Sequence, residues 1–304
     1  MIMQTKVIMQ TKVFKNFRAR QNFLLLLPVI ICVGIFSFFP IMRGVYLGFT
    51  NYQIGLPIQF NGLQNYFQIY TNGFLRVAIR NSLTLVAISM FFTYVISMTL
   101  ALLLNGPILF RGMWRTLLII PWAVPPVARI AIWERILSSN AGYLNLFLRT
   151  LRITDRDYGW LALNETALNS IAAMIVWGCI PFLTICLLAA LQSIPTEIYE
   201  AAKIDGAGAP TSFFHITMPY LREVTMVTTS LLFMWIINDF PSQYLLTRGG
   251  PGSATVTFAT ESYVQGFAFG NFGIAASYGN VLIVFILIFL FFYIRAMTGK
   301  GETR

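Results

Sequence analysis

The stretch that decides the fold is Glu200-Ala-Ala-Lys-Ile-Asp205-Gly206-Ala-Gly-Ala-Pro210, a polar island between two long apolar runs. The residues before and within it predict a short helix over Thr196–Ile204. Pro195 suits the start of a helix, and the carboxylates of Glu197 and Glu200 favour its positive N-terminal end. Gly206 suits the left-handed position that ends a helix. A second short helix is expected to follow.

The same stretch has the composition of a docking surface. Its alanines carry almost no side chain, so another backbone can approach closely; they are Ala201, Ala202, Ala207 and Ala209. Glu200, Lys203 and Asp205 offer charges to a partner. Composition alone also fits an amphipathic helix that lies on the membrane surface. The order of the residues, considered below, favours docking.

The composition is that of a polytopic membrane protein. Of 304 residues, 57% are hydrophobic and only 11% are charged, and the apolar residues are gathered in runs. The formal charge of +10 does not indicate nucleic acid, because the basic residues are dispersed and cluster only before the first apolar run, at Lys6, Lys12, Lys15, Arg18 and Arg20. Three cysteines without a ligand-like grouping predict neither a disulfide framework nor a metal site.

Apolar runs of about 20 residues, the length that crosses a bilayer, predict six spans at 22–47, 82–104, 116–137, 168–191, 221–246 and 274–296. They form one predicted domain over 22–297. An even number of spans places both termini on one side. The basic tail at 1–21, the turn at 105–115 and the tail at 298–304 then fall in the cytoplasm, as the positive-inside rule requires. The loop at 193–219 falls there too.

Two longer loops, about 48–80 and 138–167, fall on the outer side. The second is rich in charged residues, among them Arg149, Arg152, Asp155, Arg156, Asp157 and Glu165. A platform for an external partner and plain solvated connectors are both consistent with these loops.

The order Glu200-Ala201-Ala202, then Asp205-Gly206-Ala207, then Phe213, Ile216 and Pro219 resembles the EAA loop of ABC importer permeases. The resemblance implies an all-α integral membrane protein with the type I ABC importer permease fold. It also implies that 193–219 is a cytoplasmic coupling loop, whose helix sits in a cleft of a partner ATPase. The predicted ATPase contacts are Glu200, Ala201, Ala202, Asp205, Gly206 and Ala207.

A further motif resembles the MalF-like branch of carbohydrate permeases. It is Leu246-Thr247-Arg248-Gly249-Gly250-Pro251-Gly252, with Tyr263, Phe267 and Phe272-Gly273 beyond it, whereas Gly62-Leu63-Gln64-Asn65-Tyr66 and Leu191-Gln192-Ser193-Ile194-Pro195 resemble the permease family as a whole. This resemblance implies a heterodimer with a MalG-like permease, two ABC ATP-binding subunits and an extracytoplasmic solute-binding protein. It implies the cytoplasmic (inner) membrane of a bacterium or archaeon as the location. ATP and Mg would be bound by the partners, since the chain has no GxxxxGK[ST] segment and no visible catalytic motif.

Polar residues inside the spans mark candidate substrate contacts, because an ionisable group in hydrocarbon normally faces a cavity or a partner. On the fifth span Trp235, Asn238, Asp239 and Ser242 are spaced i, i+3, i+4 and i+7. This spacing predicts one helix face that offers an aromatic ring, an amide, a carboxylate and a hydroxyl to a sugar. The alternative is that Asn238 and Asp239 bond a neighbouring helix. The resemblance to MalF-like proteins favours substrate contact, and Asp239 stands where maltose permease has an asparagine.

The resemblance also places part of the fourth span beside the sugar. The residues are Gly178, Cys179, Phe182 and Leu183, which flank Pro181. A kinked helix with ordinary packing is the alternative. On the third span Arg129 and Glu134 lie five residues apart, so they could pair with loops, through water with each other, or with a bound partner, and we expect structural pairing.

Together these features predict a permease subunit of an ATP-driven, binding-protein-dependent importer of a sugar, oligosaccharide or polyol glycoside. The alternative is a self-sufficient secondary transporter coupled to an ion gradient, which needs charged residues at the membrane midplane. Asp239 is the residue that supports this alternative. An integral-membrane enzyme is not favoured, because no catalytic constellation is present in the sequence.

Overall fold

The computed structural model describes residues 26–298. The predicted tail at 1–21, the first four residues of the first predicted span and residues 299–304 lie outside that part. Within it the chain is helical, apart from one isolated bridge between Thr50 and Phe60. The all-α prediction is therefore confirmed.

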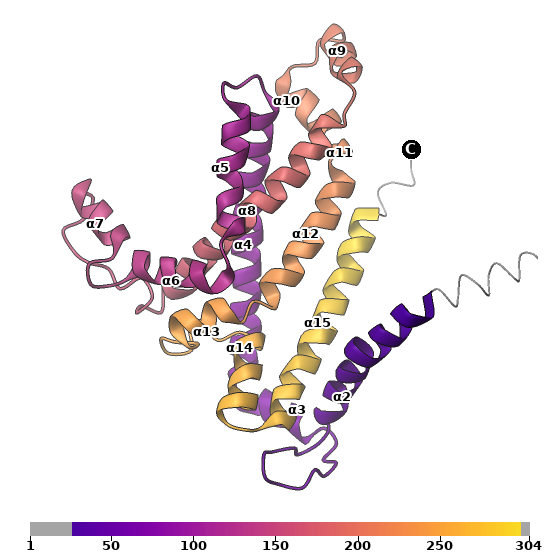
Figure 1. Cartoon of the computed structure of the whole chain (residues 1–304), viewed down its shortest axis with the longest axis vertical. Coiled ribbons are helices and arrows are strands. Elements are labelled where there is room, and N and C mark those ends of the chain that lie inside the picture. The colour runs from indigo at the N-terminus through magenta and orange to yellow at the C-terminus, as the bar shows by residue number, and fades with distance from the viewer. Residues whose placement is uncertain (1–25, 299–304) are drawn as a thin grey trace, which may run out of the picture.

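Four long helices form the centre of the molecule: α4 (Phe74–Asn105), α8 (Ala167–Gln192), α12 (Arg222–Ile237) and α15 (Phe272–Thr298). Figure 1 shows them running roughly side by side along the long axis. Their inner faces make one apolar core, whose largest fully buried side chains include Leu85, Ile171, Phe233 and Tyr278. The Phe233 ring stacks on Phe289 with centroids 3.9 Å apart, which joins α12 to α15.

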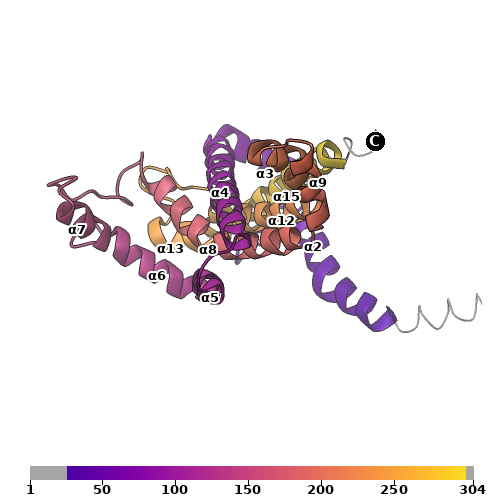
Figure 2. The same ribbon diagram turned by 90° about the horizontal axis from the view of Figure 1, so that it is seen from above.

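The first helix stands apart from this core. It runs over Leu26–Leu47, contains a π-helical turn at Gly34–Phe38, and ends in α2 (Phe39–Leu47). None of its most apolar 18-residue window is buried within the chain. Seen from above, it points away from the bundle (Figure 2). An apolar helix without buried residues must be covered by lipid or by another chain.

Helix α4 begins earlier than the sequence predicts. The predicted span starts at residue 82, whereas the helix starts at Phe74, one residue after Gly73 with φ 78°. The side-chain oxygen of Asn72 accepts the Phe74 N–H at 3.0 Å, which fixes this start. Arg76 and Arg80 lie in the first two turns and lower the local hydropathy, so the sequence pattern places the boundary too late.

The third predicted span, at 116–137, is sharply bent. The segment is α5 (Arg111–Ala123) followed by α6 (Pro126–Leu137), with a 95° bend between them. Pro125 and Pro126 cause it, because a proline forces the residue before it into an extended conformation, and Val124 has ψ 123°. At 1.5 Å per residue, the 13-residue α5 is only about 20 Å long, less than the hydrocarbon core.

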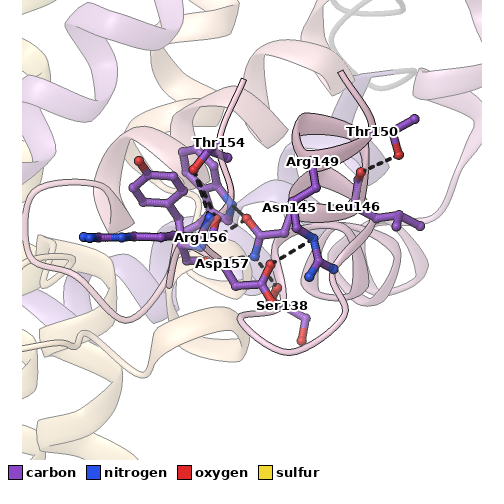
Figure 3. A network of polar contacts seen from close by, with 10 residues as sticks. Ser138, Asn145, Leu146, Arg149, Thr150, Thr154, Arg156 and Asp157 are labelled. Atoms are coloured by element: carbon purple, nitrogen blue, oxygen red, sulfur yellow. Dashed lines mark hydrogen bonds and ion pairs between the residues drawn. The ribbon is translucent and has the colours of Figure 1, made fainter. Parts of the chain in front are cut away.

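Beyond the bend, α6 and α7 (Tyr143–Thr150) extend away from the bundle as an arm (Figures 1 and 2). A polar network holds the arm together (Figure 3). Asn145, fully buried, donates to the carbonyls of Ser138 and Tyr158 and accepts from the Tyr158 N–H and the Trp160 indole N–H. The second predicted outer loop, at 138–167, is thus folded around Asn145.

The motif around Asn65 has a structural role. Its side-chain amide donates to the carbonyls of Gly48 and Thr50, at 3.0 and 2.7 Å. It lies on α3 (Gln64–Thr71), so it ties this short helix to the end of α2. Gly273 at the start of α15 donates to Tyr52 in the same loop. These bonds close the end of the bundle that lies opposite α9 in Figure 1.

Candidate coupling loop and substrate site

The coupling loop consists of α9 (Thr196–Ile204), α10 (Ala209–Ser212), a π-helical turn at Phe213–Thr217, and α11 (Met218–Tyr220). It lies at one end of the molecule, between α8 and α12 (Figure 1). The predicted bounds of α9 are confirmed. The second short helix after it is confirmed as well.

Helix α9 ends as its glycine predicts. Gly206 has φ 81°, and its N–H donates to the Lys203 carbonyl at 3.1 Å. The next N–H, that of Ala207, reaches back to Ala202 at 2.8 Å. This pair of bonds is a Schellman motif, which turns the chain sharply at the end of the helix. The left-handed conformation at Gly206 is thereby confirmed.

The predicted ATPase contacts lie on an open surface. Glu200, Ala201, Asp205 and Gly206 are exposed, and Ala202 and Ala207 are half-buried. Beside them the apolar side chain of Ile204 is 86% exposed. On the inner side, the hydroxyls of Tyr199 and Thr217 lie 2.9 Å apart and join α9 to the turn that follows. The loop is thus fixed at its base and presents charged, small and apolar groups outward.

The predicted face on the fifth span is not a face of one helix. Helix α12 ends at Ile237, and α13 (Pro241–Thr247) begins after a three-residue break. Pro241 explains the break, because a proline in a helix interior lacks the N–H donor and its ring clashes with the preceding turn. The i, i+3, i+4, i+7 spacing therefore does not bring the four side chains into one row, which corrects the prediction.

The four predicted residues of the fifth span differ in their hydrogen bonds and exposure because of this break. The side chain of Asn238 donates to the carbonyl of Met234, 2.9 Å away, and caps α12. Asp239 accepts the backbone N–H of Ser242, in the first turn of α13, at 3.4 Å. Trp235 and Asn238 are exposed, Asp239 is half-buried, and Ser242 is 1% exposed. Helix α13 packs against both α6 and α8, so the break faces the bent third segment.

The fourth-span residues divide between the site and the core. The ring of Phe182 lies 4.8 Å from that of Trp235, which joins α8 to α12 beside the break. Gly178 and Cys179 lie one turn earlier along α8. Leu183, in contrast, is fully buried in the apolar core. The structure therefore brings Phe182 to the predicted site and places Leu183 away from it.

Arg129 on α6 is a site residue that the sequence reasoning missed. Its side chain occupies the space that Gly178 leaves open, because a Cβ added to Gly178 would lie 3.0 Å from Cζ and 3.3 Å from Cδ of Arg129. Arg129 therefore lies near the contact between Phe182 and Trp235, because Gly178 is one turn before Phe182 on the same face of α8. Its position in an apolar run was the available signal, but only the bend at Pro125 shows what it faces.

The expected structural pairing of Arg129 and Glu134 is not found. Within residues 26–298, the one ion pair within 4.0 Å is Arg149–Asp157 in the arm, at 3.5 Å (Figure 3). Trp133, one turn along α6 from Arg129, instead meets Trp177 of α8 edge to face, with centroids 6.1 Å apart. The α6–α8 contact is thus aromatic, with a cation next to it.

Comparison with known proteins agrees with this architecture. Residues 94–300 match the family described as the binding-protein-dependent transport system inner membrane component. The chain is 30% identical over 280 residues to the trehalose/maltose transport system permease protein MalF of Thermococcus litoralis, covering 91% of this chain and 93% of that protein. It is 30% identical over 292 residues to the diacetylchitobiose uptake system permease protein DasB of Streptomyces coelicolor, covering 93% and 88%.

Among solved structures, the fold is similar to that of a chain in a bacterial ABC transporter involved in import of the acidic polysaccharide alginate. The TM-score is 0.81 at 23% identity, covering 96% of this chain and all of the other. The family match and the relatives cover most of the chain, and the bundle and its loop fit them. The chain therefore belongs to the inner membrane permease components of binding-protein-dependent transport systems.

Proposed function

We propose that this chain is the permease subunit of an ATP-driven importer of a sugar, oligosaccharide or polyol glycoside. The observation that carries the proposal is the position of α9. It ends in a glycine cap, its surface is exposed, and it lies at one end of α8 and α12, the two helices that meet beside the break between α12 and α13. Relatives that import trehalose, maltose and diacetylchitobiose support the substrate class. The chain itself is a transport subunit without catalytic chemistry.

The contacts of the coupling loop support a route from ATP to the substrate. Helices α8 and α12 both continue into the loop, and they carry Phe182 and Trp235 at the break. A displacement of α9 by a partner therefore moves both helices at once. Glu200, Ala201, Ala202, Asp205, Gly206 and Ala207 form the surface on which two ABC ATP-binding subunits would act. Those partners would bind ATP and Mg.

Two further partners complete the proposed importer. A MalG-like second permease would cover part of the apolar surface of Leu26–Leu47, which has no buried window within this chain. An extracytoplasmic binding protein would deliver the solute at the end opposite α9. With α9 on the cytoplasmic side of the inner membrane, both termini fall on that side as well.

The test is uptake by proteoliposomes that contain the complex purified through this chain. Vesicles are loaded with ATP and Mg, and radiolabelled maltose, trehalose or diacetylchitobiose is added outside with the binding protein. We expect uptake only when ATP and the binding protein are both present. Uptake driven by an ion gradient without ATP would instead identify a secondary transporter, and uptake of none of these sugars would contradict the substrate class.

A further inference from the structure

The side chain of Arg129 has an unusual environment for a cation on a predicted span. Its stem lies along Gly178, and its Nε is buried without a hydrogen-bond partner. It takes part in no ion pair within 4.0 Å in the described chain. Buried donors in proteins nearly always have a hydrogen-bond partner, so a donor such as this one is retained where something else satisfies it. Arg129 thus has donor capacity that this chain does not use.

Asp239 provides the opposite charge across the same site. The Ser242 N–H holds one of its oxygens at the start of α13, and α13 packs against α6, the helix that carries Arg129. The two residues form no direct ion pair, but both lie beside the contact between Phe182 and Trp235, since Arg129 lies against Gly178, one turn before Phe182, and Asp239 follows Trp235 by four residues. The carboxylate of Asp239 and the guanidinium of Arg129 therefore come from two neighbouring parts of the chain that pack against each other, the start of α13 and α6.

Aromatic rings flank the two charges. Phe182 and Trp235 meet on one side, and Trp133 and Trp177 meet between α6 and α8. Trp235 remains 45% exposed, so part of its ring is free for contact. Ring faces suit the C–H faces of a sugar, while a guanidinium donates to hydroxyl oxygens and a carboxylate accepts from hydroxyl groups.

We propose that Arg129 and Asp239 together read a pair of hydroxyl groups on a neutral sugar, and that Arg129 is a specificity-determining residue. This inference rests on the proposed function and narrows its substrate class. Because the two charges cancel, the site offers no net attraction to an acidic sugar. Removing either charge alone leaves the other uncompensated and changes which sugars bind.

The experiment is direct binding of radiolabelled sugars to the complex in nanodiscs, without the binding protein, so that delivery does not set the result. The probes are maltose, trehalose and diacetylchitobiose as neutral sugars and alginate pentasaccharide as an acidic one. Arg129→Gln and Asp239→Asn are each expected to weaken binding of the preferred neutral sugar about tenfold or more. Asp239→Asn should also increase binding of the acidic pentasaccharide relative to the neutral sugars.

Matched variants distinguish a loss of sugar contacts from a loss of folding or assembly. Glu134→Gln removes an exposed charge from the same helix and should leave binding unchanged. The double variant Arg129→Gln/Asp239→Asn buries no lone charge, so it should assemble even if a single variant does not. It should bind the neutral sugar as weakly as the single variants and show no gain for the acidic one.

The outcomes distinguish the two proposals. Wild-type preference for the acidic pentasaccharide, or unchanged neutral-sugar binding in the assembled double variant, would overturn the role of the pair. The sugar importer itself would remain supported in both cases if ATP-dependent uptake is observed. Wild-type complex that neither binds nor transports any probe would overturn the proposed function and this inference with it.

Discussion

The coupling loop and the break between α12 and α13 are both interruptions of long helices, but they are built differently. A glycine ends α9, and Glu200, Ala201 and Asp205 beside it lie exposed on the surface. A proline ends the continuity of α12, and Trp235 beside the break meets Phe182 of α8, while α13 beyond it packs against α6 and α8. The proposed function accounts for this difference, because a partner ATPase would cover the loop, whereas the break already packs against other helices of this chain.

Gly206→Pro should have the largest effect, because it removes the N–H that bonds Lys203 and fixes φ near −65° where the loop needs 81°. We expect ATP-dependent uptake to be abolished, while the chain still inserts into the membrane and the break between α12 and α13 is unchanged. Uptake and ATP hydrolysis of the reconstituted complex measure this.

The matched control is Gly208→Ala in the same loop. Gly208 has φ −72°, and an added Cβ would meet only Pro210 Cδ at 3.8 Å. It should transport as the wild type does. Normal uptake by Gly206→Pro would show that the shape of the loop does not carry the coupling.

Gly178→Ala tests the break without changing any charge. The added Cβ takes the place of the Arg129 guanidinium, a flexible group that moves at little cost in stability. We expect sugar binding to weaken about tenfold, as for the loss of one charge-assisted hydrogen bond. Gly279→Ala, where an added Cβ meets nothing within 4 Å, is the control. Equal binding by the two variants would contradict the placement of Arg129.

Trp235→Leu should have a smaller effect, since it removes one aromatic face and leaves both charges. We expect sugar binding to weaken about threefold, in the range of a single aromatic contact. Trp235→Phe keeps a ring next to Phe182 and should lie closer to the wild type. A greater loss with phenylalanine than with leucine would exclude a stacking role.

Asp157→Asn, far from both regions, should have the smallest effect. It breaks the partly exposed ion pair with Arg149, which contributes less than about 1 kcal/mol. Thermal unfolding of the complex should shift little, and uptake should not change. A loss of uptake comparable to that of Gly178→Ala would show that the arm takes part in transport through this pair.

The same contrast explains what could be predicted. The bounds of α9 and its left-handed Gly206 follow from neighbours in the sequence, because helix caps are local. The late start assigned to α4 shows that two arginines can conceal helical turns from a hydropathy pattern. Pro125 and Pro126 are present in the sequence, but a proline does not specify how far a helix turns, so the 95° bend could not be predicted. Arg129 was missed because its partners come from two other helices, whose arrangement depends on that bend.

Photo-crosslinking from α9 and from the arm tests the central claim most directly. A photoreactive amino acid is placed at Ala201 on the exposed surface of α9, and in a second variant at Phe147, exposed on the arm. Linked proteins are identified by mass spectrometry after purification from the native membrane. We predict that Ala201 links to a P-loop ATPase and Phe147 does not. The account would be contradicted if Ala201 linked to no ATPase, or if Phe147 did so in its place.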